Sequence, residues 1–251
     1  MKKRSVWRPK SCLSAVAALL IASQACAWGP LEHKAVALIA QNRLSERTRM
    51  SVQAILGMES AGLDAISNCA DGMLYAQGSF DCGGVFTMEA DPGKTTQPGH
   101  FINIPIGESE PASSWKSHCA NGKDCVVEQI RIQAAVLDDP QASLHAKRVA
   151  LMFLVHFAGD AHQPLHCAND NDWGGNTKPV TLLGRQTNLH SLWDGMIMIE
   201  DWRQKSAMDP APLVRELEAE ISRQPIASWI AGDFATSAAL ESFALAKDTV
   251  Y

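Results

Sequence analysis

Apolar residues recur at helical spacing in several separate stretches of the chain. In the first of them, Leu31, Ala35, Leu38 and Ile39 fall on one side of a helix. The pattern is strongest from Leu144 to His162, where Pro164 ends the predicted helix. The same reasoning predicts further helices over 46–58, behind a capping serine at 45, and over 126–137, 188–202, 210–222 and 226–246.

Residues 59–125 break this pattern. The segment is rich in Gly, Pro, Ser and Asp and contains one strand-like run, FINIPI at 101–106. An irregular segment of this length is usually functional, or is held in place by disulfides or metals. No internal repeat and no linker divides the 251 residues, so the chain is predicted to be a mostly α-helical single domain.

The first 27 residues have the pattern of a secretory signal peptide. Basic residues come first, an apolar run extends from Cys12 to Ala22, and the final triplet Ala25-Cys26-Ala27 is typical of a cleavage site. A membrane-spanning helix needs roughly 20 apolar residues, so cleavage is favoured over an uncleaved anchor. We therefore expect a secreted domain over 28–251, periplasmic or extracellular, that begins at Trp28.

Charge narrows the classes of partner. The full chain has a formal net charge of -5, and removal of 1–27 leaves 17 Lys and Arg against 27 Asp and Glu, a net charge of -10. Such an acidic chain is not expected to bind nucleic acid through a basic surface. Because the side chains are net negative, an anionic substrate would have to be held by positive charge from another source, such as bound cations.

Cysteines bear on the redox compartment. After cleavage the chain keeps Cys69, Cys82, Cys119, Cys125 and Cys167, an odd number, in a compartment where cysteines pair. Proximity along the chain favours Cys69 with Cys82 and Cys119 with Cys125. Cys167 would then remain free.

Two copies of a His-x-x-x-Asp pattern lie on predicted apolar helices. His156 and Asp160 form one copy, and His190 and Asp194 form the other. Residues four apart project from the same face of a helix. One such pair is usually an ordinary hydrogen bond, but several buried ionisable groups are costly unless they are paired or bind a metal.

These side chains are typical zinc ligands. Imidazole nitrogen and carboxylate oxygen bind zinc, and catalytic zinc sites keep one position open for water. His166 follows Pro164 and can fold back toward either pair. We therefore favour a metal site over a satisfied polar core, with His33, Asp71 and His100 as further candidates.

Six segments of the chain carry a resemblance to a known family. In order they are WGPLEH at 28–33, CAD at 69–71, HFINIP at 100–105, LVHFAGDAHQPLH at 154–166, DWGGN at 172–176 and NLHSLWD at 188–194. The sequence resembles the S1/P1 nuclease family of secreted zinc phosphodiesterases, a mostly helical fold within the phospholipase C/P1 nuclease superfamily.

The resemblance implies three zinc ions per chain. One would be held by Asp71, His100, His156 and Asp160, and a second by His166, His190 and Asp194. The third would use the free amino group and carbonyl of Trp28, together with His33 and a bridging Asp160. Signal cleavage would then belong to the chemistry, because an amide nitrogen is a poor metal ligand.

By the same resemblance the chain would hydrolyse single-stranded DNA and RNA to 5'-phosphate products. A metal-activated water would attack phosphorus, with Asp71 and Asp160 as the catalytic carboxylates, and 3'-nucleotidase activity is a further expectation. Phe101 would stack a base, unless it is a core residue. Asn176 would either reach the phosphate or only hold its loop.

The chain also departs from the family pattern. Leu74 stands where fungal and plant members have an arginine that helps to neutralise the phosphate, which makes Asp71 the least certain ligand, with Asp64 and Asp81 as fallbacks. Asn103 replaces a base-contacting aspartate of the fungal members. The chain ends at KDTVY, where relatives usually continue, so a C-terminal truncation is one expectation.

Two other functions stay open on the sequence. A zinc-dependent phospholipase C would use the same metals, although no amphipathic stretch rich in Lys and aromatics indicates a membrane surface. A zinc-binding protein without turnover is the other alternative. No protein partner is evident, and three histidines are left without a role: His118, His145 and His162.

Overall fold

The computed structural model describes residues 28–57, 62–76, 78–90, 96–197, 209–226, 229 and 232–251. The predicted signal peptide lies outside these residues. The α-helices are α1 (Pro30–Asn42), α2 (Glu46–Leu56), α3 (Leu63–Ile66), α4 (Cys69–Tyr75), α5 (Pro111–Ser114), α6 (Val126–Asp138), α7 (Leu144–Asp160), α8 (Leu189–Ser191), α10 (Ala211–Ile221) and α11 (Phe234–Leu245).

Shorter elements complete the described chain. Three are 3₁₀ turns, η1 (Gln97–His100), η2 (Trp115–His118) and η3 (Pro164–His166), and two are π-helical turns, η4 (Leu192–Met196) and η6 (Ala246–Val250). The strands are β1 (Gly78–Cys82), β2 (Phe86–Ala90), β3 (Ile104–Pro105), β4 (Ala168–Asn169), β5 (Pro179–Leu182) and β6 (Arg185–Asn188). In the described part they form only two-stranded sheets, with β1–β2 and β5–β6 antiparallel and β3–β4 parallel.

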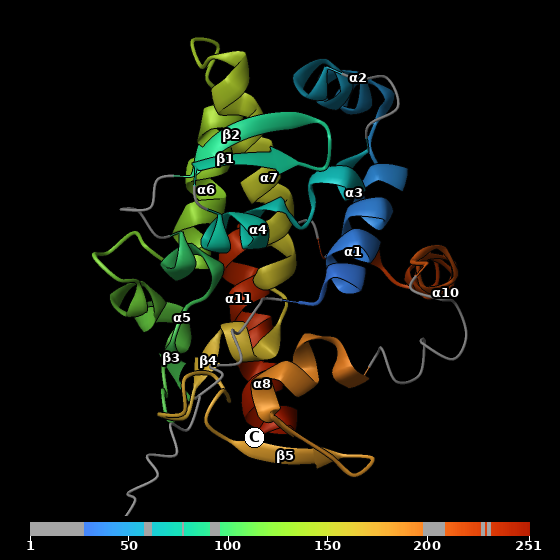
Figure 1. The fold of residues 1–251 in the computed structure, drawn as a ribbon. Helices are drawn as coiled ribbons and strands as arrows, with labels where there is room; N and C mark the ends of the chain where they lie inside the picture. The colour runs from blue at the N-terminus through green and yellow to red at the C-terminus, as the bar shows by residue number, and fades with distance from the viewer. Residues whose placement is uncertain are drawn as a thin grey trace, which may run out of the picture.

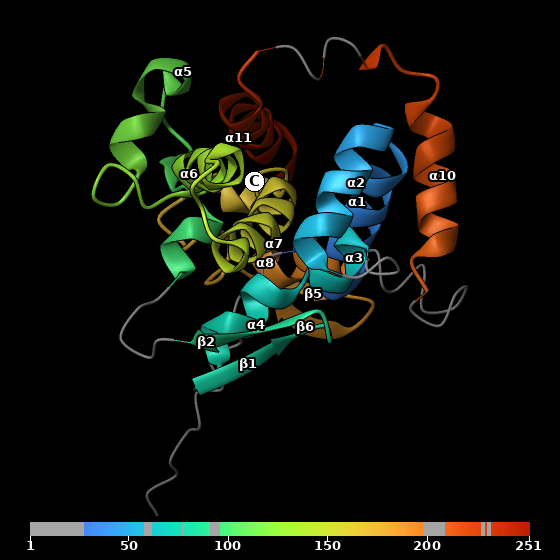
Figure 2. The ribbon, with the colours of Figure 1, turned by 90° about the horizontal axis from the view of Figure 1, so that it is seen from above.

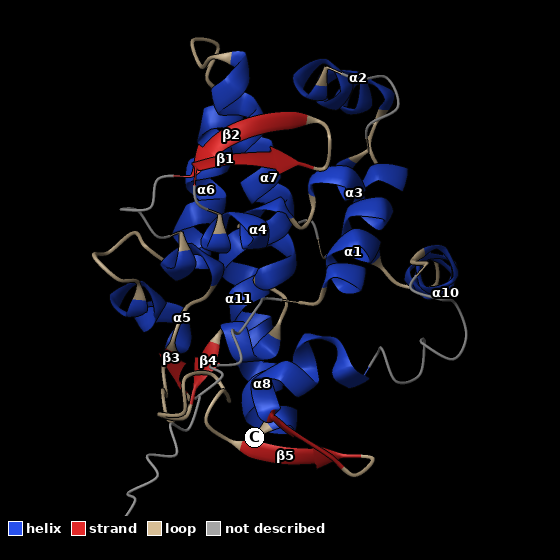
Figure 3. Cartoon of the chain, in the orientation of Figure 1, coloured by secondary structure: helices blue, strands red, loops and turns tan. Residues whose placement is uncertain are grey.

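The mostly helical single domain predicted from the sequence is confirmed (Figure 3). Helix α7 lies in its middle, packed against α6 on one side and against α1 on the other, as Figures 1 and 2 show. Helix α11 packs against α6 and η3. None of the described helices has the length and apolarity needed to cross a membrane.

The sequence of α7 explains its position. Ser143 caps its start by accepting a hydrogen bond from the backbone N–H of Ala146 at 3.1 Å. Apolar residues cover much of its circumference, and Met152, Phe153 and Phe157 are buried in the core. The rings of Phe153 and Phe157 stack with their centroids 5.2 Å apart. Because α7 is buried on several sides, the polar side chains of its last turn are held away from water.

Helix α2 matches its prediction. Ser45 accepts a hydrogen bond from the N–H of Thr48 at 3.2 Å, and Gly57 ends the helix with a φ of +74°. Left-handed backbone of this kind favours glycine at a helix end. Met58, the last residue predicted for this helix, lies outside the described residues.

Three predictions of secondary structure were partly wrong. The strand predicted over 101–106 shrinks to Ile104–Pro105, because its partner β4 offers only two residues for pairing. The helix predicted over 188–202 begins correctly, with Asn188 capping it, but passes into the π-helical η4, where Gly195 has a φ of 151°. Its last part, 198–202, lies outside the described residues. The last helix starts at Phe234 rather than 226, because Gly232 has left-handed backbone, with a φ of +83°.

The segment predicted to be irregular is pinned by both expected disulfides. Cys69 bonds Cys82, which ties α4 to β1, and Cys119 bonds Cys125 ahead of α6. Cys167 is free, as predicted, and it is buried. The segment also contains short helices and the β1–β2 hairpin, which the sequence pattern did not indicate.

Candidate metal centre

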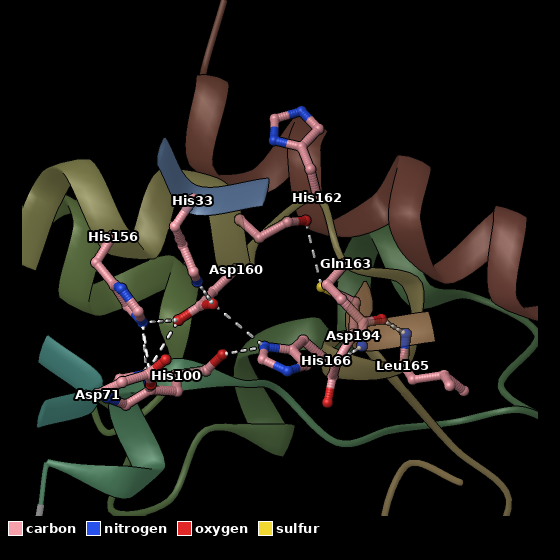
Figure 4. Close-up of polar contacts among 12 residues, drawn as sticks. His33, Asp71, His100, His156, Asp160, His162, Gln163, Leu165, His166 and Asp194 are labelled. Carbon is pink, nitrogen blue, oxygen red and sulfur yellow. Dashed lines mark hydrogen bonds and ion pairs between the residues drawn. The ribbon is translucent and has the colours of Figure 1, made fainter. Parts of the chain in front are cut away.

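The last turn of α7 presents two polar side chains to the interior. His156 and Asp160 lie on one face, four residues apart, and both are fully buried, with 0% of each residue exposed. Chain segments on either side of α7 bring further histidines and aspartates to this face (Figure 4).

Asp160 is the hub of the cluster. Its Oδ2 atom lies 3.0 Å from Nδ1 of His100 and 3.2 Å from Nε2 of His156. Its Oδ1 atom lies 3.4 Å from Nε2 of His33 and 3.7 Å from Nδ1 of His166. These four histidines come from η1, α7, α1 and η3, so one carboxylate joins four separate segments of the chain.

Asp71 joins this cluster from α4. Its Oδ1 atom lies 3.3 Å from Nε2 of His156 and 3.6 Å from Nδ1 of His100. Asp64 and Asp81, the fallback candidates, belong to none of the ligand groups found among the described residues. Leu74 lies three residues farther along α4 and is partly buried.

His33 reaches the cluster from the first turns of α1. Its ring stacks on that of His156, with centroids 3.9 Å apart and an angle of 15° between the planes. Gly159 makes room for this ring, because a Cβ atom there would lie 2.9 Å from Nδ1 of His33. Trp28 is two residues ahead of α1 and is partly buried. Its neighbour Gly29 donates its N–H to the main-chain oxygen of Asp194.

A second group lies on the other side of Asp160. The rings of His166 and His190 stack with centroids 5.1 Å apart, and Nε2 of His190 lies 3.4 Å from Oδ2 of Asp194. Across the described residues, three sets offer ligand atoms within 4.8 Å of one another: His33, Asp71 and His156; His100, His156 and Asp160; and His166, His190 and Asp194.

Main-chain carbonyls orient three of the rings. The Nδ1 atoms of His156, His166 and His190 donate to the oxygens of Ser67, His100 and Gly174, at 2.7, 2.8 and 2.6 Å. A carbonyl oxygen only accepts, so each Nδ1 carries the hydrogen and Nε2 is left as the nitrogen that can bind a metal. Such contacts fix the tautomer of metal-binding histidines.

Burial and charge shift the titration of these groups. Burial lowers the pKa of His33 and of His190, and it lowers the pKa of His166 to about 3. Burial alone would raise the pKa of Asp160, but His156 and its other histidine neighbours hold it well below the usual range. Conversely, Asp160 and Asp71 outweigh burial and raise the pKa of His156 well above its ordinary value.

Asp194 behaves differently. Burial, reinforced by other carboxylates, raises its pKa well above the ordinary value, although Gln163 donates Nε2–H to its Oδ1 at 2.6 Å. A buried carboxyl of this kind takes up a proton unless a cation neutralises it. A bound cation would therefore stabilise its charged form.

The residues fit a metal site on a further test. Several buried polar atoms that face the centre have no hydrogen-bond partner, among them Nε2 of His33, Oδ1 of Asp71 and Oδ1 of Asp160. Buried polar groups are almost always hydrogen-bonded, so unpartnered ones require an explanation. Converging imidazole and carboxylate atoms with free lone pairs are the donor set of zinc.

The loop over 169–176 supports the second group. Oδ1 of Asn169 accepts from the N–H groups of Asp172 and Gly174, and Oδ1 of Asp172 accepts from the N–H of Gly175 at 2.8 Å. These hydrogen bonds fix the position of the Gly174 carbonyl oxygen, which accepts the hydrogen bond from Nδ1 of His190. Asn176 donates Nδ2–H to the oxygen of Trp173 at 2.9 Å, a contact within the loop.

The remaining sequence candidates lie around this centre. Phe101 follows His100 directly and is partly buried, whereas Asn103 is exposed. His162 is exposed and points away from the cluster (Figure 4). Its Nδ1 atom lies 3.0 Å from the main-chain oxygen of Ala158. His118 pairs with Glu108 at 3.4 Å, and His145 lies against Phe86.

Some supporting residues were missed in the sequence. Gln163 is fully buried and orients Asp194, and its place inside the GDAHQPLH segment was the available signal. Trp173 is 79% exposed and has a φ of 61°, which is unusual for a bulky residue. The acceptors at Ser67 and Gly174 are main-chain carbonyl oxygens, so the residue types gave no indication of their role.

The S1/P1 Nuclease family model matches residues 28–251, which include every residue of the cluster. The chain belongs to the S1/P1 nuclease family. Nuclease S1 of Aspergillus oryzae is 31% identical over 187 residues, 74% of this chain and 60% of that protein. Endonuclease 2 of Arabidopsis thaliana is 31% identical over 182 residues, 68% of this chain and 56% of the relative.

Nuclease P1 of Penicillium citrinum is 29% identical over 224 residues, 82% of this chain and 73% of that protein. The matches to the Aspergillus and Arabidopsis relatives thus span less than two thirds of their lengths. As a member of the S1/P1 nuclease family, this chain combines a nuclease-family sequence with three His/Asp groups that could hold metal ions.

Proposed function

We propose that this chain is a secreted, zinc-dependent phosphodiesterase that hydrolyses single-stranded DNA and RNA to 5'-phosphate products, with 3'-nucleotidase activity as well. Export would follow removal of residues 1–27, and the two disulfides are consistent with an oxidising compartment. The match to the family model begins at Trp28, the expected new amino terminus.

The observation that carries the proposal is the convergence of four histidines on Asp160. Buried charges of this kind are costly unless they are paired or coordinate a metal. We assign Asp71, His100, His156 and Asp160 to one zinc, and His166, His190 and Asp194 to a second. Trp28, His33 and Asp160 are assigned to the third.

Bound zinc would act as a Lewis acid on the phosphate and lower the pKa of a water molecule to near neutrality. The chain's own part is to hold that chemistry in place. Asp160 lies between the groups and within 3.7 Å of four histidines, Asp71 supplies a second carboxylate from α4, and carbonyl contacts fix His156, His166 and His190. The bound cations would also attract an anionic substrate to an acidic protein.

Phe101 is the proposed base-stacking residue. It is partly buried and directly follows His100 in the chain. Stacking on an aromatic ring contributes about 1 to 3 kcal/mol per base and tolerates any base. Asn176 is proposed to act by holding the loop, since its amide contacts Trp173.

The test is product analysis on defined substrates. The zinc-loaded chain beginning at Trp28 is incubated with a single-stranded oligonucleotide, its duplex, a 3'-nucleotide and phosphatidylcholine vesicles. We expect rapid release of 5'-nucleotides from the single strand and slow release from the duplex. Cleavage of the phospholipid alone would instead identify a phospholipase C, and no cleavage of any substrate a zinc-binding protein without turnover.

Phe101→Leu separates stacking from a core role. If Phe101 stacks a base, this variant raises KM for the oligonucleotide and leaves the thermal unfolding midpoint close to that of the unmodified protein. If Phe101 is a core residue, the unfolding midpoint falls and KM stays unchanged.

A further inference from the structure

Glu32 is a buried carboxylate without a partner. It lies in the first turn of α1, next to His33, and only 5% of the residue is exposed. Neither Oε1 nor Oε2 has a hydrogen-bond partner. Burial of an unpaired carboxylate is costly, so a side chain in this state points to a cationic group that neutralises it.

Two glycines enclose this carboxylate. A Cβ atom at Gly29 would lie 2.6 Å from Oε2 of Glu32, and a Cβ atom at Gly195 would lie 2.9 Å from Oε1. Gly29 precedes α1 directly, and its N–H donates to the main-chain oxygen of Asp194. The carboxylate is therefore held where the chain enters α1 and meets η4.

The surroundings of Glu32 offer oxygen atoms and no donor. A Cβ atom at Gly29 would lie 2.6 Å from Oε2 of Glu32 and 2.8 Å from the main-chain oxygen of Asp194, so both oxygens border the same space. Among the described residues, no side chain donates to either carboxylate oxygen of Glu32. A buried carboxylate in such surroundings requires a donor that the described side chains do not supply.

We propose that Glu32 accepts hydrogen bonds from the free α-amino group of Trp28 and positions it. This inference rests on the proposed function, in particular on cleavage ahead of Trp28. Residue 28 adjoins Gly29, where a Cβ atom would lie 2.6 Å from Oε2 of Glu32, and consecutive Cα atoms are about 3.8 Å apart. An amine bound to zinc through its lone pair would keep two hydrogens to donate, whereas an amide nitrogen keeps one and is a poor metal ligand.

In this proposal Glu32 is a positioning residue that acts on the amino group of Trp28. It belongs to none of the ligand sets among the described residues, whereas His33, its neighbour, does. Carboxylates behind a metal-binding group orient that group, and their loss weakens metal binding by about 10- to 100-fold. Glu32 would act in this way on the amino terminus.

The experiment is built on four proteins, to which further variants are added. One pair begins at Trp28, with and without Glu32→Gln, and the other pair has one serine ahead of Trp28, again with and without Glu32→Gln. Zinc affinity is measured by competition with a chelator, and circular dichroism checks the fold. The control is Glu46→Gln, which removes an exposed carboxylate from the first turn of α2.

In the chain that begins at Trp28, Glu32→Gln should weaken the binding of one zinc by about 10-fold or more. The added serine should weaken the same zinc by itself, and Glu32→Gln should then have little further effect. Glu32→Ala should repeat this pattern. Glu46→Gln should change nothing in either chain.

Two results would overturn the proposal. An equal loss of affinity in both chain lengths would give Glu32 a structural role independent of the amino group, and no loss in the Trp28 chain would remove its role altogether. Hydrolysis is measured separately on the unmodified chain. If that chain binds zinc but cleaves no nucleic acid, the proposed function fails while the dependence on Glu32 can still hold.

Discussion

The Nε2 atom of His156 lies 3.2 Å from the Nδ1 atom of His100, and both face the same oxygen of Asp160. The other ring nitrogen of His156, Nδ1, donates a hydrogen bond to the main-chain oxygen of Ser67. Because nearby carboxylates raise the pKa of His156 well above its ordinary value, the metal-free centre holds a proton here. Zinc would replace that proton, so metal binding should release protons.

Asp160→Asn tests the hub of the cluster. The substitution keeps the shape of the side chain but removes the charge that faces four histidines. We expect zinc content to fall and hydrolysis of single-stranded DNA to be lost together, measured by elemental analysis and nucleotide release. An Asp160→Asn protein with full zinc content and full activity would contradict the bridging role.

The pKa of His166 predicts a pH dependence of stability. Its folded-state pKa of about 3 lies below the ordinary value of 6.5, so between these pH values the unfolded chain binds the extra proton. The metal-free protein should therefore lose stability as pH falls from 6.5 toward 3, by about 1.4 kcal/mol per pH unit for each such group.

The measurement is the free energy of unfolding of chelator-treated protein at several pH values. His166→Asn should make the dependence shallower, and the exposed His145→Asn should leave it unchanged. Equal slopes for all three proteins would mean that His166 does not titrate as inferred.

The disulfide between Cys69 and Cys82 should support Asp71. It closes a sequence separation of 13 residues and begins α4, two residues before Asp71. Replacing both cysteines by alanine should destabilise the protein by about 3 kcal/mol and lower zinc content. The Cys119–Cys125 pair, with a separation of 6, is the comparison and should cost about 2 kcal/mol with zinc content retained.

Tyr251 should influence the second group at a distance. Its hydroxyl donates to Oδ1 of Asp172 at 2.8 Å, and Asp172 holds the loop whose Gly174 carbonyl receives His190. Tyr251→Phe removes one hydrogen bond to a carboxylate, worth about 2 kcal/mol. We expect a lower unfolding midpoint and weaker zinc binding; unchanged zinc affinity would show that the loop holds His190 unaided.

Much of the fold followed from local pattern. The apolar periodicity of 144–162 and the caps Ser45 and Ser143 predicted α7 and α2 closely, because their signals lie in adjacent residues. Chain proximity predicted both disulfides. The π-helical turn at Gly195 and the short pairing of β3 with β4 depend on distant segments, so no local pattern indicated them.

The site was predicted unevenly for the same reason. The His-x-x-x-Asp spacing placed His156 with Asp160 and His190 with Asp194, since each pair shares a helical face. Local spacing could not show that His33, 123 positions from His156, would stack on it. Nor could it show that Glu32 would be buried, because Gly195, which approaches its carboxylate, lies far along the chain.

Zinc stoichiometry with nucleotide release, both measured on one sample of the chain beginning at Trp28, tests the central claim most directly. We expect about three zinc ions per chain and release of 5'-nucleotides from single-stranded DNA and RNA that stops when a chelator removes the metal. Little or no zinc in correctly folded protein would contradict the proposal, and the histidines around Asp160 would then form a purely structural network.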